Sequence, residues 1–177
     1  KMGKKVILLD ADFGLANIEI MLGVRPRYNL ADLMFKGKEM KDIITYGPEN
    51  IGFISGGSGI NEMANLTKDQ VSHLIEKMCE LDRIADVIIV DTGAGIGDAV
   101  LEFVAASSEV LLVATPEDTS ITDAYALLKS LNRCSSYHPG KTTVKMIANQ
   151  VREDKDAAEL FGKIAVSYTH LTLPTKA

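Results

Sequence analysis

Residues 3–17, GKKVILLDADFGLAN, decide the fold class of this chain. Four consecutive apolar residues, Val6 to Leu9, lead directly into the acidic pair Asp10 and Asp12 and a glycine. A short continuous apolar run of this kind is typical of a strand that is buried on both faces of a parallel sheet. Because ligands bind beyond the carboxyl ends of such strands, the acidic pair is the first candidate for chemistry.

The same pattern recurs along the chain. Apolar, β-branched runs predict further strands at 86–90, 110–114 and 144–148, with a weaker one at 51–54. Between them, apolar residues spaced by three and four predict helices over 67–81, with Thr67 as its N-cap, and over 99–106, 121–131 and 157–164. Strands that alternate with helices predict an α/β fold: a doubly wound, mostly parallel sheet with helices on both faces.

Composition sets limits on class and partners. The 177 residues suit one domain, and 46% hydrophobic with 24% charged residues favours a globular protein. The net charge of −5 and the scattered lysines and arginines disfavour direct nucleic-acid binding. No apolar run approaches the roughly 20 residues that span a bilayer, and no signal peptide is visible, so we expect a cytoplasmic protein.

The cysteines and histidines predict no metal centre. Cys79 and Cys134 stand far apart without a CxxC pair, which argues against zinc or an iron–sulfur cluster, and we interpret both as ordinary buried thiols. The three histidines, His73, His138 and His170, have no visible triad or metal partner.

Acidic and glycine residues at the predicted strand ends are the strongest functional signal. Asp10 and Asp12 could hold a hydrated Mg²⁺ or orient a water for attack on a phosphate, although acidic residues after a strand also cap helices. Asp91 ends a hydrophobic strand in IIVDTGAG, the place of a Walker B aspartate, although glycine turns are ordinary in α/β domains. Gly93, Gly95 and Gly97 permit a turn whose N–H groups can approach a phosphate.

Two other candidates are weaker by themselves. Asn149 follows the predicted strand 144–148, and its amide could pair with adenine or simply form a turn. Residues 56–59, GGSG, lack the G-x-x-x-x-G-K-[ST] spacing of a phosphate-binding loop, so we interpret them as a flexible loop.

Taken together, residues 3–23, 54–66, 91–131 and 147–151 resemble the MinD/ParA family of deviant Walker P-loop ATPases. The DADFGLAN and DTGAGI segments carry this resemblance in combination. The stretch PEDTSITDAYALLK, residues 116–129, is most similar to the FlhG branch, also called FleN or YlxH, which regulates flagellar number and placement. The resemblance covers roughly residues 3–165.

The resemblance implies roles for particular residues. Asp10 and Asp12 would belong to switch I: Asp10 would contact the bound nucleotide, and Asp12 would be the catalytic residue beside the Mg²⁺ water shell. Asp91 would be the Walker B aspartate, in contact with nucleotide and Mg²⁺. Gly95 would face the γ-phosphate and Asn149 would contact adenine. The residues expected near an ATP-dependent homodimer face are Asn17, Glu117 and Asp123.

The family pattern also differs from this chain at its ends. Family members begin with a strand and a K-G-G-x-G-K-[ST] loop that grips the phosphates, and neither precedes Lys1, so we expect this chain alone to bind ATP poorly and to be inactive. Residues 1–165 would be the P-loop NTPase domain fragment and 166–177 a non-native tail. A signal-recognition-type flagellar GTPase is the implied partner. Membrane contact, peripheral at the inner membrane, would need a C-terminal amphipathic helix that this sequence does not show.

Several alternatives stay open at this point. The chain could be a non-catalytic interaction module of the same fold, or part of a general cell-division or partition ATPase of the MinD/ParA type. A phospho-receiver domain is disfavoured because Asp91 lies about 80 residues after the acidic pair and Asn149 stands where a lysine is needed. A Rossmann dehydrogenase is disfavoured because no G-x-G-x-x-G follows the first strand.

Overall fold

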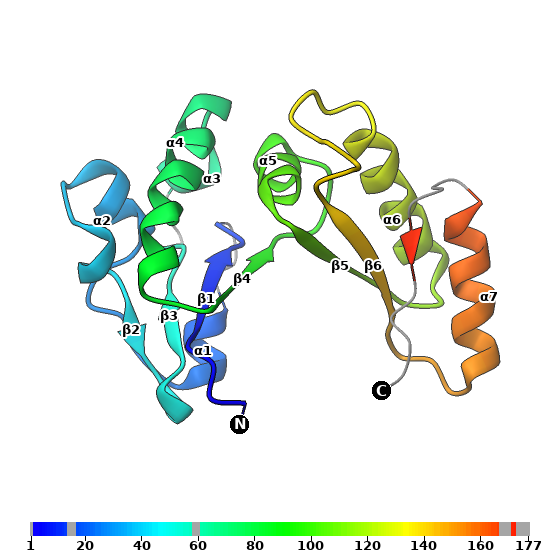
Figure 1. Ribbon diagram of the computed structural model, residues 1–177, viewed down its shortest axis with the longest axis horizontal. Coiled ribbons are helices and arrows are strands. Elements are labelled where there is room, and N and C mark those ends of the chain that lie inside the picture. The colour runs from blue at the N-terminus through cyan, green and yellow to red at the C-terminus, as the bar shows by residue number, and fades with distance from the viewer. Residues whose placement is uncertain (1, 14–16, 58–60, 167–170, 173–177) are drawn as a thin grey trace. The chain divides into compact units, whose positions relative to one another are not determined.

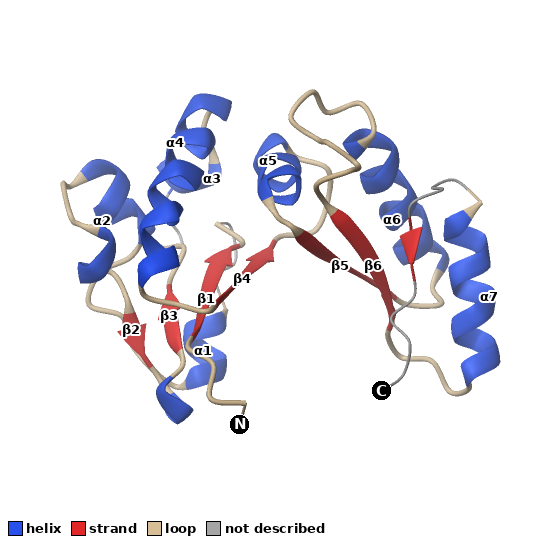
Figure 2. Ribbon diagram, in the orientation of Figure 1, coloured by secondary structure: helices blue, strands red, loops and turns tan. Residues whose placement is uncertain are grey.

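The computed structural model describes residues 2–13, 17–57, 61–166 and 171–172. The chain divides into two compact units, Lys1–Ala94 and Gly95–Ala177, which we call unit 1 and unit 2. Each unit has its own sheet, and helices alternate with strands along the chain (Figures 1 and 2). The predicted α/β class with mostly parallel strands is confirmed.

Unit 1 contains a four-stranded sheet in the order β2-β3-β1-β4. The inner strand β1 (Val6–Ala11) runs parallel to β3 (Gly52–Ile54) and to β4 (Val87–Thr92). The edge strand β2 (Thr45–Tyr46) is antiparallel to β3. The three strands predicted in this half of the chain are therefore confirmed, with boundaries that differ by one or two residues.

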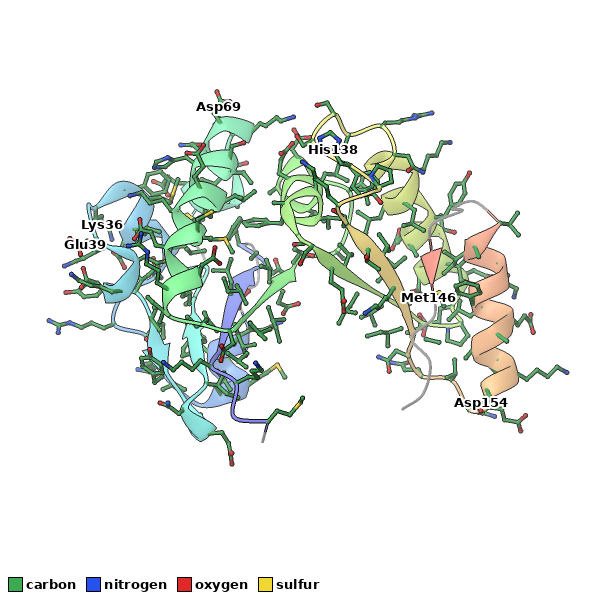
Figure 3. The ribbon with its side chains drawn as sticks, in the orientation of Figure 1. Lys36, Glu39, Asp69, His138, Met146 and Asp154 are labelled. Atoms are coloured by element: carbon green, nitrogen blue, oxygen red, sulfur yellow. The ribbon has the colours of Figure 1, made fainter. Side chains whose placement is uncertain are left out.

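The core of unit 1 explains why these strands are apolar. Leu9 of β1 and Phe53 and Ile54 of β3 have no solvent exposure, and neither have Leu74 and Leu81. Leu74 lies in α4 (Lys68–Met78), whose predicted N-cap Thr67 accepts from the Gln70 N–H while the Gln70 side chain accepts from the Thr67 N–H. This capping box satisfies two donors that a helix start leaves unpaired, and Figure 3 labels Asp69 in the same first turn.

Three short helices of unit 1 escaped the sequence pattern: α1 (Ile18–Leu22), α2 (Leu30–Phe35) and α3 (Asn61–Ala64). Helices of four to six residues are too short to display an apolar period. Short 3-10 turns complete the unit at Met40–Asp42, Pro48–Asn50 and Cys79–Arg83.

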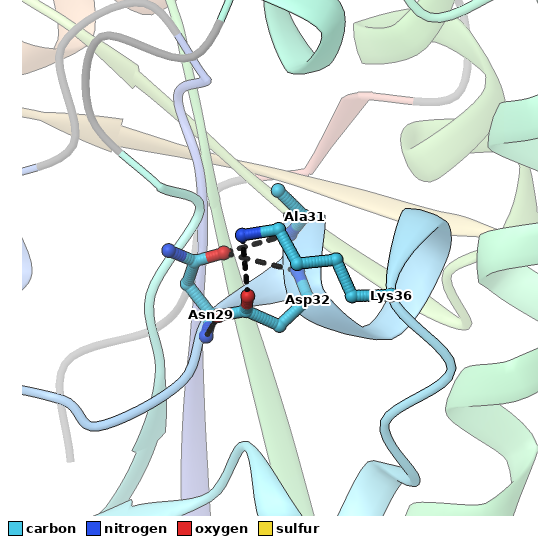
Figure 4. Close-up of polar contacts among 4 residues, drawn as sticks. All are labelled: Asn29, Ala31, Asp32 and Lys36. Carbon is cyan, nitrogen blue, oxygen red and sulfur yellow. Dashed lines mark hydrogen bonds and ion pairs between the residues drawn. The ribbon is translucent and has the colours of Figure 1, made fainter.

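Helix α2 is held by a polar cluster at its start, drawn in Figure 4. The Asn29 side-chain oxygen accepts from the N–H groups of Ala31 and Asp32, at 2.9 and 3.2 Å. Asp32 accepts in return from the Asn29 N–H at 2.9 Å and from the Lys36 ammonium at 2.9 Å. The Lys36 hydrogen bond, with the Asn29 N–H and the nearby cation Lys38, lowers the pKa of the Asp32 carboxyl.

We expect Asp32→Asn to lower the free energy of unfolding by about 1 kcal/mol at pH 7. Because the pKa of Asp32 is lowered on folding, its stabilisation is present above the unfolded value and is lost as pH falls below about 4. Urea unfolding at pH 7 and pH 3 measures both effects. The difference between the two proteins should shrink at pH 3. Asp69→Asn, an exposed acid in the first turn of α4, is the matched control and should change stability by less than about 0.5 kcal/mol.

Unit 2 contains a parallel three-stranded sheet in the order β5-β6-β7. The predicted strands are confirmed as β5 (Glu109–Ala114) and β6 (Thr143–Ala148), and the predicted helices as α5 (Asp98–Ala106), α6 (Asp118–Leu131) and α7 (Asp154–Ala165). Strand β7 (Leu171–Thr172) lies inside the stretch 166–177 that the sequence pattern left outside the fold.

The two faces of the unit 2 sheet differ. Leu112 of β5 and Met146 of β6, which Figure 3 labels, pack into a core with residues of α6 and α7 such as Leu128 and Leu160. On the opposite face of β5, Leu111 and Val113 are 53% and 55% exposed. The apolar run therefore predicts the strand correctly, but the expected burial on both faces is wrong for β5, because only the face that carries Leu112 is covered.

Two sequence-level interpretations are corrected here. Cys79 is exposed and Cys134 is half-buried, so neither is a buried thiol; Cys79 follows the last turn of α4 and donates from its sulfur to the Ile75 carbonyl. Gly56 and Gly57 are buried and packed, so a flexible loop is wrong for them, and residues 58–59 lie outside the described residues. None of the described helices is both long and apolar enough to cross a bilayer.

Candidate functional site

The acidic residues of unit 1 meet where β1 and β4 end. The parallel register pairs Leu9 with Val90, Asp10 with Asp91, and Ala11 with Thr92. Paired residues of parallel neighbouring strands project to the same side of the sheet, so two carboxylates 81 positions apart in sequence become neighbours. The D-x-D segment and Asp91 therefore lie next to each other at the carboxyl ends of β1 and β4.

Asp10 is the most enclosed of these carboxylates, with 1% of its surface exposed. Its Oδ2 accepts from the N–H groups of Asn17 and Ile18 at 2.8 and 3.1 Å, and its Oδ1 accepts from the Asp12 N–H at 3.3 Å. Burial raises the pKa of the Asp10 carboxyl; the three N–H donors oppose this, and the charge of Asp91 adds to it. The Asp10 side chain therefore caps the start of α1, whose own N-cap residue, Asn17, makes no side-chain capping hydrogen bond.

Asp12 and Asp91 are more open than Asp10. Asp12 is half-buried and Asp91 is exposed. The Asp12 carboxylate lies against Gly93, because a β-carbon built on that glycine would stand 3.2 Å from both Cγ and Oδ1 of Asp12. The loop after β4 thus approaches the Asp12 side chain closely, and the absence of a side chain at position 93 makes the approach possible.

A second contact joins α1 to the end of β3. The buried Ser55 hydroxyl donates to the Glu19 carboxylate of α1 at 3.1 Å and accepts from the Gly57 N–H at 3.3 Å. A β-carbon on Gly56 would stand only 2.5 Å from the Asp10 carbonyl oxygen. The backbone after β3 therefore packs directly on the end of β1. Sequence reasoning missed this contact because Glu19 and Ser55 are 36 residues apart and carry no motif.

The carboxylates of unit 1 do not form a complete metal site by themselves. No group of three or more His, Cys, Asp or Glu side chains poised to hold a metal occurs among the residues that the structure describes. Mg²⁺ in proteins is commonly held by one or two carboxylates, with water and substrate phosphate oxygens as the remaining ligands. The exposed carboxylate of Asp91 and the half-buried carboxylate of Asp12 fit that mode of binding.

The other predicted site residues belong to unit 2, apart from Asn17, which is exposed just before α1. Gly95 has a φ of 110°, a conformation that favours glycine. Asn149 follows β6, is exposed, and accepts from the Gln150 N–H at 3.0 Å, as a turn asparagine does. The exposed Glu117 and Asp123 lie at the start of α6 and in its second turn.

The chain is similar in sequence and in fold to known proteins. The chain is 42% identical over 163 residues to the antiactivator FleN of Pseudomonas aeruginosa, covering 92% of this chain and 57% of that protein. It is 31% identical over 165 residues to the flagellum site-determining protein YlxH of Helicobacter pylori, covering 93% and 54%. The septum site-determining protein MinD of Pyrococcus horikoshii, solved with Mg-ADP, has the same fold, with a TM-score of 0.71, 21% identity, and coverage of 92% and 66%. No protein-family model matches the chain.

These similarities define the class: the chain belongs to the MinD/ParA-like family of P-loop proteins. Within that family it stands close to the FleN/FlhG branch. The chain spans somewhat more than half the length of the curated relatives it matches.

Proposed function

We propose that this chain is the switch-bearing part of an ATP-binding and ATP-hydrolysing protein that regulates the number or placement of flagella. Its similarity to FleN and YlxH supports the flagellar role. The observation that carries the chemical part is the register of β1 and β4, which sets Asp10 opposite Asp91 and brings Asp12 against Gly93.

In this proposal the two open carboxylates have separate tasks. Asp91 and Asp12 would hold the water shell of Mg²⁺, and Asp12 would also orient the water that attacks the γ-phosphate. Bound Mg²⁺ would supply neutralisation of the phosphate charge. In unit 2, the Gly95 backbone would approach the γ-phosphate, and Asn149 would contact the adenine edge.

The phosphate grip would come from a strand and loop of the family type in a longer protein. The edge position of β4 supports this, because among the described strands β4 is the last in the order β2-β3-β1-β4 and pairs with β1 alone. An apolar edge strand with open N–H and C=O groups is a surface that pairs with another strand. We assign the strand that leads into the phosphate-binding loop to this edge.

The proposed partners are those that the resemblance to the MinD/ParA family implies. A second copy of the protein would close on ATP through a face that includes Asn17, Glu117 and Asp123. A signal-recognition-type flagellar GTPase is the proposed second partner, and membrane recruitment is assigned to a C-terminal amphipathic helix of the longer protein.

The test compares this chain with a version extended at its N-terminus by a family-type strand and K-G-G-x-G-K-[ST] loop. Calorimetry measures Mg·ATP binding, and phosphate release measures turnover. We expect the extended protein to bind and hydrolyse ATP, the present chain to do neither measurably, and Asp12→Ala in the extended protein to lower turnover by about 100-fold or more.

If the extended protein binds no nucleotide, the ATPase proposal fails. The better interpretation would then be a non-catalytic interaction module that keeps the fold. Turnover that survives Asp12→Ala would contradict the assignment of Asp12 while leaving the ATPase proposal in place.

A further inference from the structure

One side chain, that of Asp10, accepts hydrogen bonds from both ends of the connection between β1 and α1. The Asp10 carboxylate accepts from the Asp12 N–H with one oxygen and from the N–H groups of Asn17 and Ile18 with the other. Asp12 and Asn17 are the two ends of the connection from β1 to α1. A single buried group therefore fixes both ends of the segment that carries Asp12.

The oxygens of Asp10 are already engaged by the protein. The side chain is almost fully buried, and its three N–H donors supply hydrogen bonds that a carboxylate away from water requires. By contrast, Asp91, its partner in the register, is exposed. Of the two neighbouring carboxylates, only Asp91 is open to a ligand from solvent.

The elements around Asp10 keep it in this position. Gly56 lets the backbone after β3 pack on the Asp10 carbonyl, with no room for a β-carbon. The hydrogen bond from Ser55 to Glu19 holds α1 at a second point, on the residue that follows Ile18. The start of α1 is thus tied to the ends of both β1 and β3.

We propose that Asp10 is a positioning residue, which pins both ends of the segment carrying Asp12 and binds neither nucleotide nor metal itself. This inference assigns Asp10 a different role from the cofactor contact that the family resemblance implies. It rests on the proposed function for the role of Asp12, while the anchoring itself is a property of this chain alone.

The first test measures amide hydrogen exchange by NMR in the present chain, without nucleotide or metal. In Asp10→Ala we expect exchange of the Asn17 and Ile18 amides to accelerate by about tenfold or more, because each loses a hydrogen bond to a charged acceptor. The control Asp12→Asn also removes a carboxylate from this segment but leaves the Asp10 acceptors intact, so protection should be retained. Unchanged exchange in Asp10→Ala, or equal loss in Asp12→Asn, would overturn the inference.

The second test uses the extended protein and the isosteric variant Asp10→Asn. Its single side-chain oxygen can still accept from the α1 amides, while its NH2 group loses the contact with the Asp12 N–H. A positioning role predicts that Asp10→Ala lowers kcat by about 30-fold with unchanged ATP affinity, and that Asp10→Asn restores part of it. A ligand role predicts that both variants weaken Mg·ATP binding alike, and that result would overturn the proposal. If the extended protein turns over no ATP at all, the proposed function fails, and the exchange measurement still decides the role of Asp10. Asp10→Asn also serves if Asp10→Ala does not fold.

Discussion

Replacing Gly56 with alanine is expected to lower the free energy of unfolding of unit 1 by about 2 to 3 kcal/mol. The added β-carbon would stand 2.5 Å from the Asp10 carbonyl oxygen and 3.2 Å from Cδ1 of Phe13. The first neighbour is backbone in a paired strand, so it cannot turn aside as a flexible side chain would. The end of β1 or the segment after β3 must shift, and the hydrogen bonds of Asp10 and Ser55 lie on that contact.

Urea unfolding followed by circular dichroism measures the loss of stability, and hydrogen exchange at β1 and β3 assigns it to unit 1. The matched control is Gly162→Ala in α7, where nothing lies within 4 Å of the new β-carbon. Since alanine is the better helix former, the control should stabilise α7 by about 0.5 to 1 kcal/mol. If Gly56→Ala is as stable as the parent chain, the close approach of the two backbones is wrong.

The second large effect is expected for Gly93→Ala, which should lower ATP turnover rather than stability. The ideal β-carbon at this position lies 3.2 Å from Cγ and Oδ1 of Asp12, so Gly93→Ala would push the carboxylate aside. A side-chain end can move by a few tenths of an ångström at little cost, and we expect stability to change by less than about 1 kcal/mol. Displacement of a group that orients a reacting water is expected to lower ATP turnover of the extended protein by roughly 10- to 100-fold.

Gly162→Ala in α7 is the control for this prediction as well, because its new β-carbon has nothing within 4 Å and the residue is not part of the proposed nucleotide site. In an Asp12→Ala background, Gly93→Ala should cause no further loss, since its effect passes through the Asp12 carboxylate. In the present chain, the NMR shift of the Asp12 carboxyl carbon should change in Gly93→Ala and not in Gly162→Ala. Full turnover in Gly93→Ala would show that the position of Asp12 does not limit the reaction.

These two glycines show how the site depends on close backbone approaches. Gly56 supports the end of β1 from the side of β3, and Gly93 makes room for Asp12 on the side of β4. Asp10 lies between them and holds the start of α1. The proposed reaction therefore requires three neighbouring strand ends to be in place together, which makes stability of unit 1 a condition for activity.

Much of the architecture could be predicted from local patterns. Continuous apolar runs predicted β1, β4, β5 and β6 because such runs are typical of strands in parallel sheets, although β4 and β5 each leave one face exposed. The period of α4, with Thr67 before it, predicted that helix and its cap. Helices α1 and α2 were missed because five or six residues show no period. The burial of Cys79 was predicted wrongly, because Cys79 lies at the end of a helix that is exposed to solvent, and this position decides its exposure more than the apolar character of its thiol.

By itself, the sequence determined the α/β class, the acidic residues at the strand ends and the resemblance to the MinD/ParA family, because these depend on residue type and spacing along the chain. Only the tertiary structure decided which carboxylate is a buried anchor and which is partly exposed. Asp10 and Asp12 are equivalent in the motif, but their surroundings differ: Asp10 is enclosed by amides of α1, while Asp12 lies against Gly93. Those neighbours come from segments far apart in sequence, and hydrogen bonding and burial act between atoms that are close in space.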